Sequence, residues 1–156
     1  MDNALKQIRS IADYQFGRGT GEKLFPDDVD VVYSPTTKRI RYVNLDGKRL
    51  ATLRPTDSLF SLSIFAAQRL VEKEAPLHCF VVVRDDVKKF IAEGGDVFAA
   101  HVVRADGEIR SKDEVVVIDE DGQVLAVGRA LLGGAEMQSF KTGVAVKVRH
   151  GCSGDR

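Results

Sequence analysis

The second half of the chain alternates short apolar runs with turn residues, which is the pattern of a sheet made of brief strands. β-Branched and other apolar residues dominate these runs, and turns such as Asp106-Gly107 and residues 119–122 separate them. Strands this short, with turns at such close intervals, are typical of a small barrel. The predicted strands are residues 80–84, 97–103, 114–118, 123–130 and 141–150.

One helix is predicted among these strands, over residues 85–92. Val87, Phe90 and Ile91 fall on one face at helical spacing. Asp85 is placed to cap the first turn, and Gly94 is placed to end the helix.

The first half predicts an antiparallel meander. In its middle strand, the pattern puts the arginines on one face and Ile40 and Tyr42 on the other. Asp46-Gly47 predicts a tight hairpin after that strand. The predicted strands are residues 29–33, 39–44, 49–54 and, more briefly, 59–62.

A meander needs a cover for its apolar side, and two amphipathic helices are available. They are predicted over residues 4–14 and 64–72, and Ser63 is placed to cap the second. The predicted apolar faces are Leu5, Ile8 and Ile11 in the first helix and Ile64, Ala67 and Val71 in the second.

Ala75-Pro76 marks a boundary, because proline restricts the residue before it and breaks helices. We therefore expect an α+β chain of two domains, residues 1–76 and 77–156. The first is a small antiparallel meander packed by two helices, and the second is a β pseudo-barrel with one helix.

Composition narrows the class of protein. The chain has 156 residues, of which 44% are hydrophobic and 29% charged, as in soluble globular domains. No apolar run approaches the roughly 20 residues of a membrane helix. The first residues lack the basic start and apolar core of a secretion signal. We therefore expect a cytoplasmic protein that does not enter a membrane.

The overall charge does not favour nucleic acid. Lys and Arg number 12 against 10 Asp and Glu in residues 1–76, and 11 against 13 in residues 77–156. Attraction to phosphate depends on a local patch and not on the total. Any binding of RNA must therefore come from the arrangement of a few cations.

Candidate metal ligands and nucleophiles are sparse. Cys79 and Cys152 are expected to be free thiols. A metal site that they share with His78 and His150 is a less favoured alternative, because structural zinc ligands usually have closer paired spacing. His101 lies alone in a predicted strand and is expected to be structural.

Two further features allow a catalytic reading. Asp27, Asp28 and Asp30 cluster at a strand entrance, where acidic residues commonly face solvent. Alternate glycines in residues 17–21 leave a nucleotide-binding loop as an alternative to a flexible connector, but the spacing of a P-loop is absent and no strand precedes them. We expect no intrinsic catalysis, no cofactor and no metal.

Several motifs of the second half together resemble a PUA domain, a pseudo-barrel RNA-binding module of pseudouridine synthases and archaeosine transglycosylases. The motifs are Gly94-Gly95 before Asp96-Val97-Phe98, residues 113–117, residues 126–130 and residues 141–150. The resemblance implies that RNA lies on the helix, on the glycine loop after it and on the edge of the last strand.

The first half resembles the small domain that precedes PUA in archaeal tRNA-guanine transglycosylases and archaeosine synthases. The motifs are residues 13–17, 24–26 and 54–62. The resemblance implies a tRNA-binding module for tRNA base modification, with a separate catalytic subunit as a possible partner. A catalytic barrel takes roughly 250 residues, more than this chain has, and the cysteine–lysine motif of the synthases is missing.

The resemblance places the RNA-binding residues on this sequence. Glycines matter because the main chain can approach a ribose or phosphate there, and the cations are expected to contact phosphates. Phe98 and Phe140 are expected to fill the barrel, with base stacking as the alternative. The predicted RNA-binding residues are Lys88, Lys89, Gly94, Gly95, Asp96, Val97, Arg129, Lys141, Lys147 and Arg149.

Each of these features also has a plain structural explanation. Lys88 and Lys89 are compatible with a solvated helix face, the glycine pair with a helix stop, and Lys147 and Arg149 with charges that guard an edge strand. In the first half, a second basic patch is predicted at Arg39, Arg41, Lys48 and Arg49. The alternative function is a protein–protein adaptor subunit of an RNA-modifying enzyme that does not touch RNA.

Overall fold

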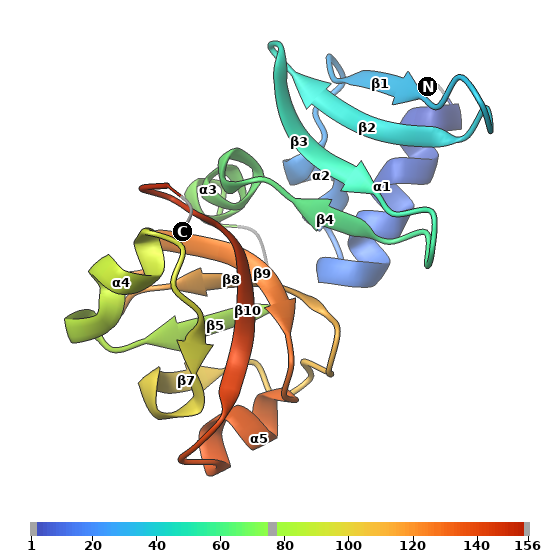
Figure 1. Cartoon of the computed structure of the whole chain (residues 1–156). Helices are drawn as coiled ribbons and strands as arrows, with labels where there is room; N and C mark the ends of the chain where they lie inside the picture. Colours follow the sequence, from blue (N-terminus) through green and yellow to red (C-terminus); the bar gives the residue numbers. More distant parts are fainter. Residues whose placement is uncertain (1–2, 75–77, 155–156) are drawn as a thin grey trace. The chain divides into compact units, whose positions relative to one another are not determined.

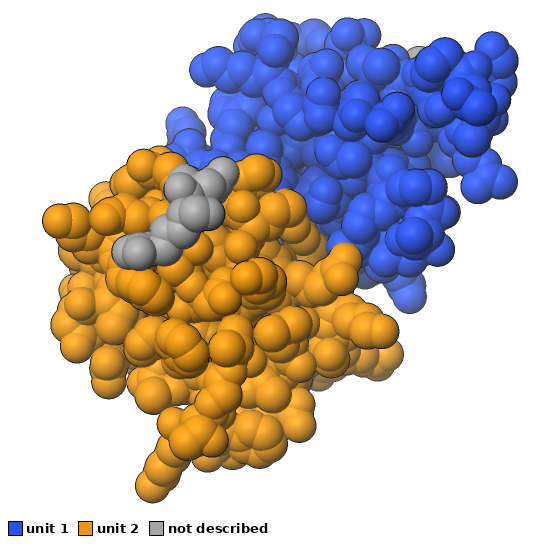
Figure 2. Space-filling view, viewed as in Figure 1, with its two compact units in different colours: residues 1–77 blue, residues 78–156 orange. Residues whose placement is uncertain are grey.

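A computed structural model describes residues 3–74 and 78–154 of the chain. Its contacts divide into two compact units, residues 1–77 and 78–156, which Figure 2 colours separately. The boundary predicted at Ala75-Pro76 falls outside the described residues. Each unit is described by itself.

The first unit contains a four-stranded antiparallel sheet in which the strands follow one another in sequence order (Figure 1). Asp46 and Gly47 have φ angles of 52° and 77°, which are the two left-handed residues of a tight hairpin. The predicted meander is therefore confirmed, and the short fourth strand extends it. The strands are β1 (Asp30–Tyr33), β2 (Ile40–Leu45), β3 (Lys48–Leu53) and β4 (Phe60–Leu62).

Two helices cover this sheet as predicted. Helix α1 (Asn3–Phe16) contacts β4, and helix α3 (Ile64–Glu72) packs on β3. The Oγ atom of Ser63 accepts a hydrogen bond from the Ala66 amide at 3.0 Å, which confirms the predicted cap. The buried residues of α3 are Ala66, Ala67 and Leu70, so its apolar face is rotated from the predicted one.

A third helix, α2 (Thr20–Leu24), occupies part of the stretch predicted as a flexible connector. Oδ1 of Asp13 accepts hydrogen bonds from the amides of Gly19 (3.2 Å) and Gly21 (2.7 Å). A Cβ atom on Gly21 would overlap with the carbonyl oxygen of Arg9, so glycine permits the close approach of α1 and α2. The helix depends on these contacts, which the local sequence does not reveal.

The placement of Tyr42 also differs from the prediction. Its side chain was expected to share the core face of β2 with Ile40, but Val43 and Leu45 are the buried residues beyond Ile40. Tyr42 is half-buried, and the guanidinium carbon of Arg49 lies 3.5 Å from its ring centroid. A register irregularity between Val43 and Asn44 interrupts the simple alternation.

The second unit contains a six-stranded sheet in the order β6-β10-β9-β8-β5-β7. Its edge strands, β6 and β7, are joined in sequence by the short 3₁₀ turn η2 (Ala99–His101), which brings the two edges together into a nearly closed barrel. The predicted α+β pseudo-barrel is confirmed. The strands are β5 (Phe80–Val83), β6 (Val97–Phe98), β7 (Val102–Ala105), β8 (Glu114–Ile118), β9 (Val124–Ala130) and β10 (Val144–Gly151).

The turn η2 corrects the prediction of one continuous strand over residues 97–103. His101 lies in this turn, and its Nδ1 accepts a hydrogen bond from the Phe98 amide at 3.1 Å. The Phe98 ring meets the His101 ring edge-on at 5.3 Å between centroids. His101 thus stabilises the corner at which the chain passes from one sheet edge to the other.

The predicted helix over residues 85–92 is a 3₁₀ turn, η1 (Asp85–Val87), followed by helix α4 (Lys88–Ala92). Asp85 does not cap it by its side chain, because the 3₁₀ turn already begins at this residue. Ile91 is buried, but Phe90 is 38% exposed. A further helix, α5 (Gly134–Ser139), was not predicted, and its buried Met137 anchors it.

Candidate nucleic-acid interface

Helix α4 ends in a tight glycine turn. Gly94 has a φ angle of 100°, and its amide donates to the Ile91 carbonyl at 2.9 Å, while the Gly95 amide donates to Phe90 at 3.0 Å. These two bonds form a Schellman motif, so the predicted helix stop at Gly94 is confirmed. Both amides therefore have partners within the protein.

Gly95 and Val97, two predicted contact residues, are buried. A Cβ atom on Gly95 would overlap with the Phe90 ring, so the absence of a side chain makes room for this ring. The main chain of Val97 pairs with Val146 of β10. The side chain of Val97 is fully buried and does not lie on the surface.

Asp96 connects the glycine turn to the last strand. Its Oδ1 accepts a hydrogen bond from the Val148 amide at 3.0 Å, and its Oδ2 lies 3.4 Å from Nζ of Lys147. Strand β10 pairs with β9 on one side and with β6 on the other, where Val146 makes the last pair. Beyond Val146, the carboxylate of Asp96 takes the place of a neighbouring strand at Val148.

The far end of β10 packs against the end of α4. A Cβ atom on Gly151 would overlap with the Ala92 carbonyl oxygen and lie 2.7 Å from the Gly94 amide nitrogen. The Ser153 amide also donates to the Ala92 carbonyl at 2.8 Å. The glycine turn, Asp96 and the last strand therefore form one connected surface.

Arg149 was predicted to project from this surface beside Lys147, but it is held by a carboxylate. Its Nη1 donates to Oε1 of Glu114 at 2.9 Å, and its Nη2 pairs with Oε2. The Glu114 side chain is 0% exposed, while that of Arg149 is 34% exposed. Because Arg149 forms a two-bond pair with a buried carboxylate, its main role is to stabilise the fold.

The other predicted cations lie at the surface. Arg129 faces Lys147 directly across β9 and β10, so two like charges are neighbours on one sheet face. The Lys147 side chain is 68% exposed, and among described residues its one ion pair is with Asp96. Among the predicted RNA-binding residues, the cations that are exposed and make no ion pair with another described residue are Lys88, Lys89, Arg129 and Lys141.

Two aromatic side chains add to this surface. Phe98 and Phe140 are 42% and 48% exposed. The prediction that they fill the barrel is therefore wrong, and the alternative placement at the surface is the one observed. An aromatic ring at the surface offers a stacking face to an unpaired base.

Two titratable groups of this unit have pKa values that burial shifts. Burial, and to a lesser degree the carboxylate of Glu114, raises the pKa of the Cys79 thiol, so the thiol stays protonated. Burial, helped by Arg84, lowers the pKa of His101, which favours its neutral ring. Cys152, His78 and His150 are exposed while Cys79 is buried. The described residues contain no cluster of three potential metal ligands.

In the first unit, groups from both candidate sites, the aspartate cluster and the glycine stretch, make contacts within the protein. Oδ1 of Asp27 pairs with Arg9 at 3.0 Å. The amides of Gly19 and Gly21, which a nucleotide loop would present to phosphate, donate to Asp13.

In the part of the chain that the structure describes, no helix is long and apolar enough to cross a bilayer.

The second basic patch is associated with aromatic rings, because the guanidinium carbons of Arg41 and Arg49 lie 5.0 and 3.5 Å from the centroid of the same Tyr42 ring. Arg49 lies over Tyr42 and its Nε donates to Asn44 at 3.0 Å, while Nζ of Lys48 lies 5.2 Å from the Phe65 ring centroid. The two other members, Arg39 and Arg41, line a pocket in the first unit. Sequence reasoning missed this pocket, although two similar Pro-Thr loops that frame it are visible in the sequence.

Comparison with known proteins gives two domain matches. Residues 6–76 match the patch-forming domain C2 of tRNA-guanine transglycosylase, and residues 80–152 match the PUA domain. The chain is 43% identical over 148 residues to the tRNA-guanine(15) transglycosylase of Methanobrevibacter smithii, a match that covers 94% of this chain and 22% of that protein. The same enzyme of Pyrococcus furiosus is 43% identical over 150 residues, with 96% and 25% covered. The chain thus spans about a quarter of the length of these relatives.

Solved structures resemble the whole chain. A hypothetical protein of Pyrococcus horikoshii OT3 aligns with a TM-score of 0.76 at 29% identity, with 94% of this chain and 89% of that chain covered. A conserved PUA domain protein of Thermoplasma acidophilum aligns with a TM-score of 0.68 at 20% identity, with 95% and 87% covered, and shows a shared fold. The chain therefore joins a domain of the C2 type to a PUA domain and is homologous to the C-terminal portion of archaeal tRNA-guanine(15) transglycosylases.

Proposed function

We propose that this chain is a non-catalytic tRNA-binding module that serves a base-modifying enzyme. The PUA domain and the homology to a tRNA-modifying enzyme support an RNA-binding accessory role. The observation that carries the proposal is the surface of the second unit. There hydrogen bonds join Asp96 and the end of α4 to strand β10 and the residues after it, and exposed cations lie on these elements. In this proposal the two units act as separate domains, residues 1–76 and 77–156, and the protein works with tRNA in the cytoplasm.

We assign fewer residues to direct RNA contact than the sequence predicts. Lys88 and Lys89 on α4, together with Arg129, Lys141 and Lys147 around β9 and β10, are the cations that we assign to phosphates. Gly94 and Gly95 set the path of the main chain, and Asp96 orients it. Phe98 and Phe140 are assigned to unpaired bases, which suits recognition of the shape and the end of a folded RNA.

Chemistry is assigned to another polypeptide. The thiol of Cys79 is buried and protonated, and the acidic cluster of the first unit is exposed or paired with Arg9. The relatives of this chain are about four times its length. The partner that we propose is a separate catalytic subunit of a tRNA-modifying enzyme.

The proposal is tested by the affinity for tRNA of the Lys88→Glu/Lys147→Glu double variant. We expect affinity to fall at least about tenfold at low salt, because two phosphate contacts become repulsive. Arg149 is left intact, since a glutamate there would face the buried Glu114 and unfold the protein. The matched control is Lys6→Glu/Arg18→Glu, which changes the net charge equally with exposed residues of the first unit.

An unchanged affinity in the Lys88→Glu/Lys147→Glu variant would contradict the proposed surface. If, in addition, the unmodified protein showed no tRNA binding alone or with its partner, the adaptor function would replace the RNA-binding one.

A further inference from the structure

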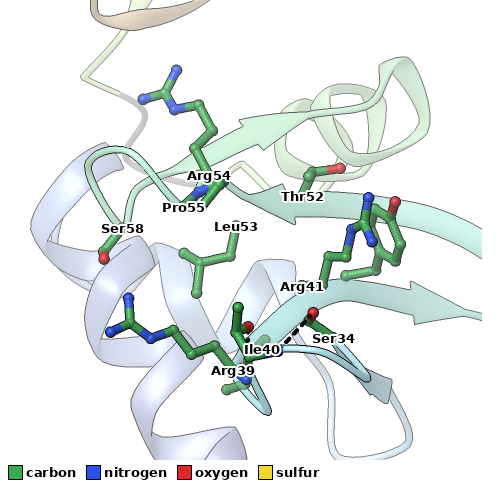
Figure 3. A pocket seen from close by; sticks show the side chains of 11 residues that line it. Ser34, Arg39, Ile40, Arg41, Thr52, Leu53, Arg54, Pro55 and Ser58 are labelled. Atoms are coloured by element: carbon green, nitrogen blue, oxygen red, sulfur yellow. Dashed lines mark hydrogen bonds between the residues drawn. The ribbon is translucent and has the colours of Figure 1, made fainter.

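A pocket of about 320 Å³ lies at one end of the sheet of the first unit (Figure 3). In an antiparallel meander, the loop between the first two strands and the loop between the last two lie at the same end. These are residues 34–39, between β1 and β2, and residues 54–59, between β3 and β4. The pocket opens between them, above the strand segments that they join.

The two loops are built alike. Each begins with a residue followed by Pro-Thr, and in each the fifth residue donates its amide to the first: Lys38 to Ser34 at 2.9 Å, and Ser58 to Arg54 at 2.9 Å. Lys38 and Ser58 also have left-handed φ angles of 64° and 59°. Non-glycine residues held in this conformation mark a well-determined backbone and are enriched at binding sites. The pocket therefore has a preformed frame.

The lining is cationic at its rim and apolar at its floor. Arg39, Arg41 and Arg54 supply the charge, and no carboxylate of a described residue lines the pocket. Arg54 is paired with Asp57 at 3.0 Å, whereas Arg39 and Arg41 are exposed and make no ion pair with another described residue. The charge available to a ligand is thus concentrated on Arg39 and on Arg41, whose guanidinium carbon lies 5.0 Å from the Tyr42 ring centroid.

The floor decides what kind of anion fits. Ile40, Leu53 and Pro55 present apolar surface, and Figure 3 shows the Leu53 side chain between Arg39 and Arg41. An inorganic anion would pair with the arginines but leave this surface uncovered. A ligand with a phosphate and a flat, largely apolar body satisfies both parts, and the volume lies at the lower end of the roughly 300–1,000 Å³ of ligand pockets.

We infer that this pocket binds one nucleotide of single-stranded RNA, with its phosphate on Arg39 and Arg41 and its base over Leu53 and Pro55. Hydroxyl groups of Ser34, Thr37 and Ser58 line the same space and can bond to the ribose or to base edges. The inference adds a contact in the first unit to the RNA binding proposed for the second. It rests on that function only for the choice of RNA over other phosphorylated ligands.

The first test is a titration of the full chain with adenosine 5′-monophosphate, cytidine 5′-monophosphate and inorganic phosphate, followed by the methyl NMR signals of Ile40 and Leu53. We expect both nucleotides to shift these signals, and inorganic phosphate to bind at least about tenfold more weakly. Equal binding of inorganic phosphate, or no shift with either nucleotide, would overturn the inference. The Arg39→Gln/Arg41→Gln variant should abolish the shifts, whereas Arg18→Gln/Arg110→Gln removes the same charge elsewhere and should keep them.

The second test is the affinity of both variants for an RNA with a single-stranded end. We expect the Arg39→Gln/Arg41→Gln variant to bind more weakly and to lose about 0.7 from the log–log salt slope for each phosphate contact removed. Unchanged RNA binding would overturn the assignment to RNA, as would tight binding of a phosphorylated peptide in the pocket. If the nucleotides shift the methyl signals of Ile40 and Leu53 but the unmodified protein does not bind tRNA, the pocket is a nucleotide site and the tRNA-binding function proposed above is rejected.

Discussion

The pair of Glu114 and Arg149 shows how a single contact changes the role of a cation. Arg149 alternates with Lys147 on β10, yet it reaches a carboxylate on β8 that has no exposed surface. A buried carboxylate without its partner is strongly destabilising, whereas an exposed pair contributes little. Arg149 therefore stabilises the fold, whereas Lys147 is the cation of the last strand that is available to a ligand.

Replacement of Arg149 by Met should therefore destabilise the protein more than replacement of Lys147. We expect Arg149→Met to lower the free energy of unfolding by about 2–4 kcal/mol, because the Glu114 carboxylate stays buried and loses its two-bond pair with Arg149. Lys147→Met, the control, should change it by at most about 1 kcal/mol. Urea denaturation measures both, and the Glu114→Gln/Arg149→Met double variant should recover part of the loss. Equal stability of the two single variants would contradict the structural role of Arg149.

His101 makes stability depend on pH. Burial, with Arg84 adding to it and Asp86 opposing, lowers the pKa of His101 in the folded protein. The unfolded chain then binds this proton at a higher pH than the folded one. The stabilisation is present above the unfolded pKa of about 6.5 and is lost as the pH falls from there through the folded pKa. Protonation of Nδ1 also removes the acceptor for the Phe98 amide.

The His101→Gln variant should accordingly lose part of the decrease in melting temperature between pH 7.5 and pH 5. The control is His78→Gln, which changes an exposed histidine and should keep the full decrease. Melting curves at four or five pH values measure the difference. A His101→Gln variant with the same pH dependence as the unmodified protein would show that this ring does not contribute.

At the scale of elements, the contact between β10 and α4 depends on the absence of a side chain at Gly151. The Ala92 carbonyl and the Gly94 amide, both main-chain groups, occupy the space that a Cβ atom needs. Main-chain atoms move less easily than the tip of a side chain, so the strand and the helix end must separate to admit it.

We expect Gly151→Ala to lower the free energy of unfolding by about 3 kcal/mol, at the upper end of the usual cost of overpacking. Gly107→Ala is the matched control, because no atom lies within 4 Å of its Cβ position, and it should change stability by less than about 0.5 kcal/mol. Denaturant midpoints compare the two variants. A neutral Gly151→Ala would mean that the two elements are less tightly packed than described.

Elements with strong local signals were predictable from the sequence, and those held by distant contacts were not. Helix α3 was predicted with its bounds because Ser63 caps an uninterrupted apolar pattern. Helix α2 has a glycine at its second position and depends on the carboxylate of Asp13 in the preceding helix. The turn η2 was read as strand because Val97 to Val103 is almost wholly apolar and gives no local sign of a corner.

In the candidate site, too, the features with a local sequence signal were predictable and those that depend on distant contacts were not. The glycine turn after α4 follows from Gly94-Gly95, and the cations of the last strand follow from its alternation. The partner of Arg149 is 35 residues away in the sequence, so the loss of this cation to Glu114 was not predictable. The exposure of Phe98 and Phe140 depends equally on how the sheet closes.

For the whole molecule, a net charge of zero makes the affinity for RNA depend on a small number of contacts. Five exposed cations are assigned to phosphates in the second unit: Lys88, Lys89, Arg129, Lys141 and Lys147. Each neutralised phosphate contributes about −0.7 to −0.9 to the slope of log affinity against log salt.

We therefore expect these five contacts to contribute about −4 to the slope for tRNA, and one phosphate on Arg39 and Arg41 to add about −0.7, measured by titration between 50 and 400 mM KCl. The Lys88→Glu/Lys147→Glu variant should have a slope nearer −2, and the Lys6→Glu/Arg18→Glu control should keep the original value. A slope close to zero in the unmodified protein would indicate that uncharged contacts dominate the interface.

The return of the chain to α4 after Gly151 also affects how such measurements are designed. Ser153 is bonded to Ala92, at the end of the helix that carries Lys88 and Lys89. A polyhistidine tag or a fusion partner attached after residue 156 would begin within a few residues of this helix and would crowd its ligand. Removal of such a tag by protease avoids this artefact.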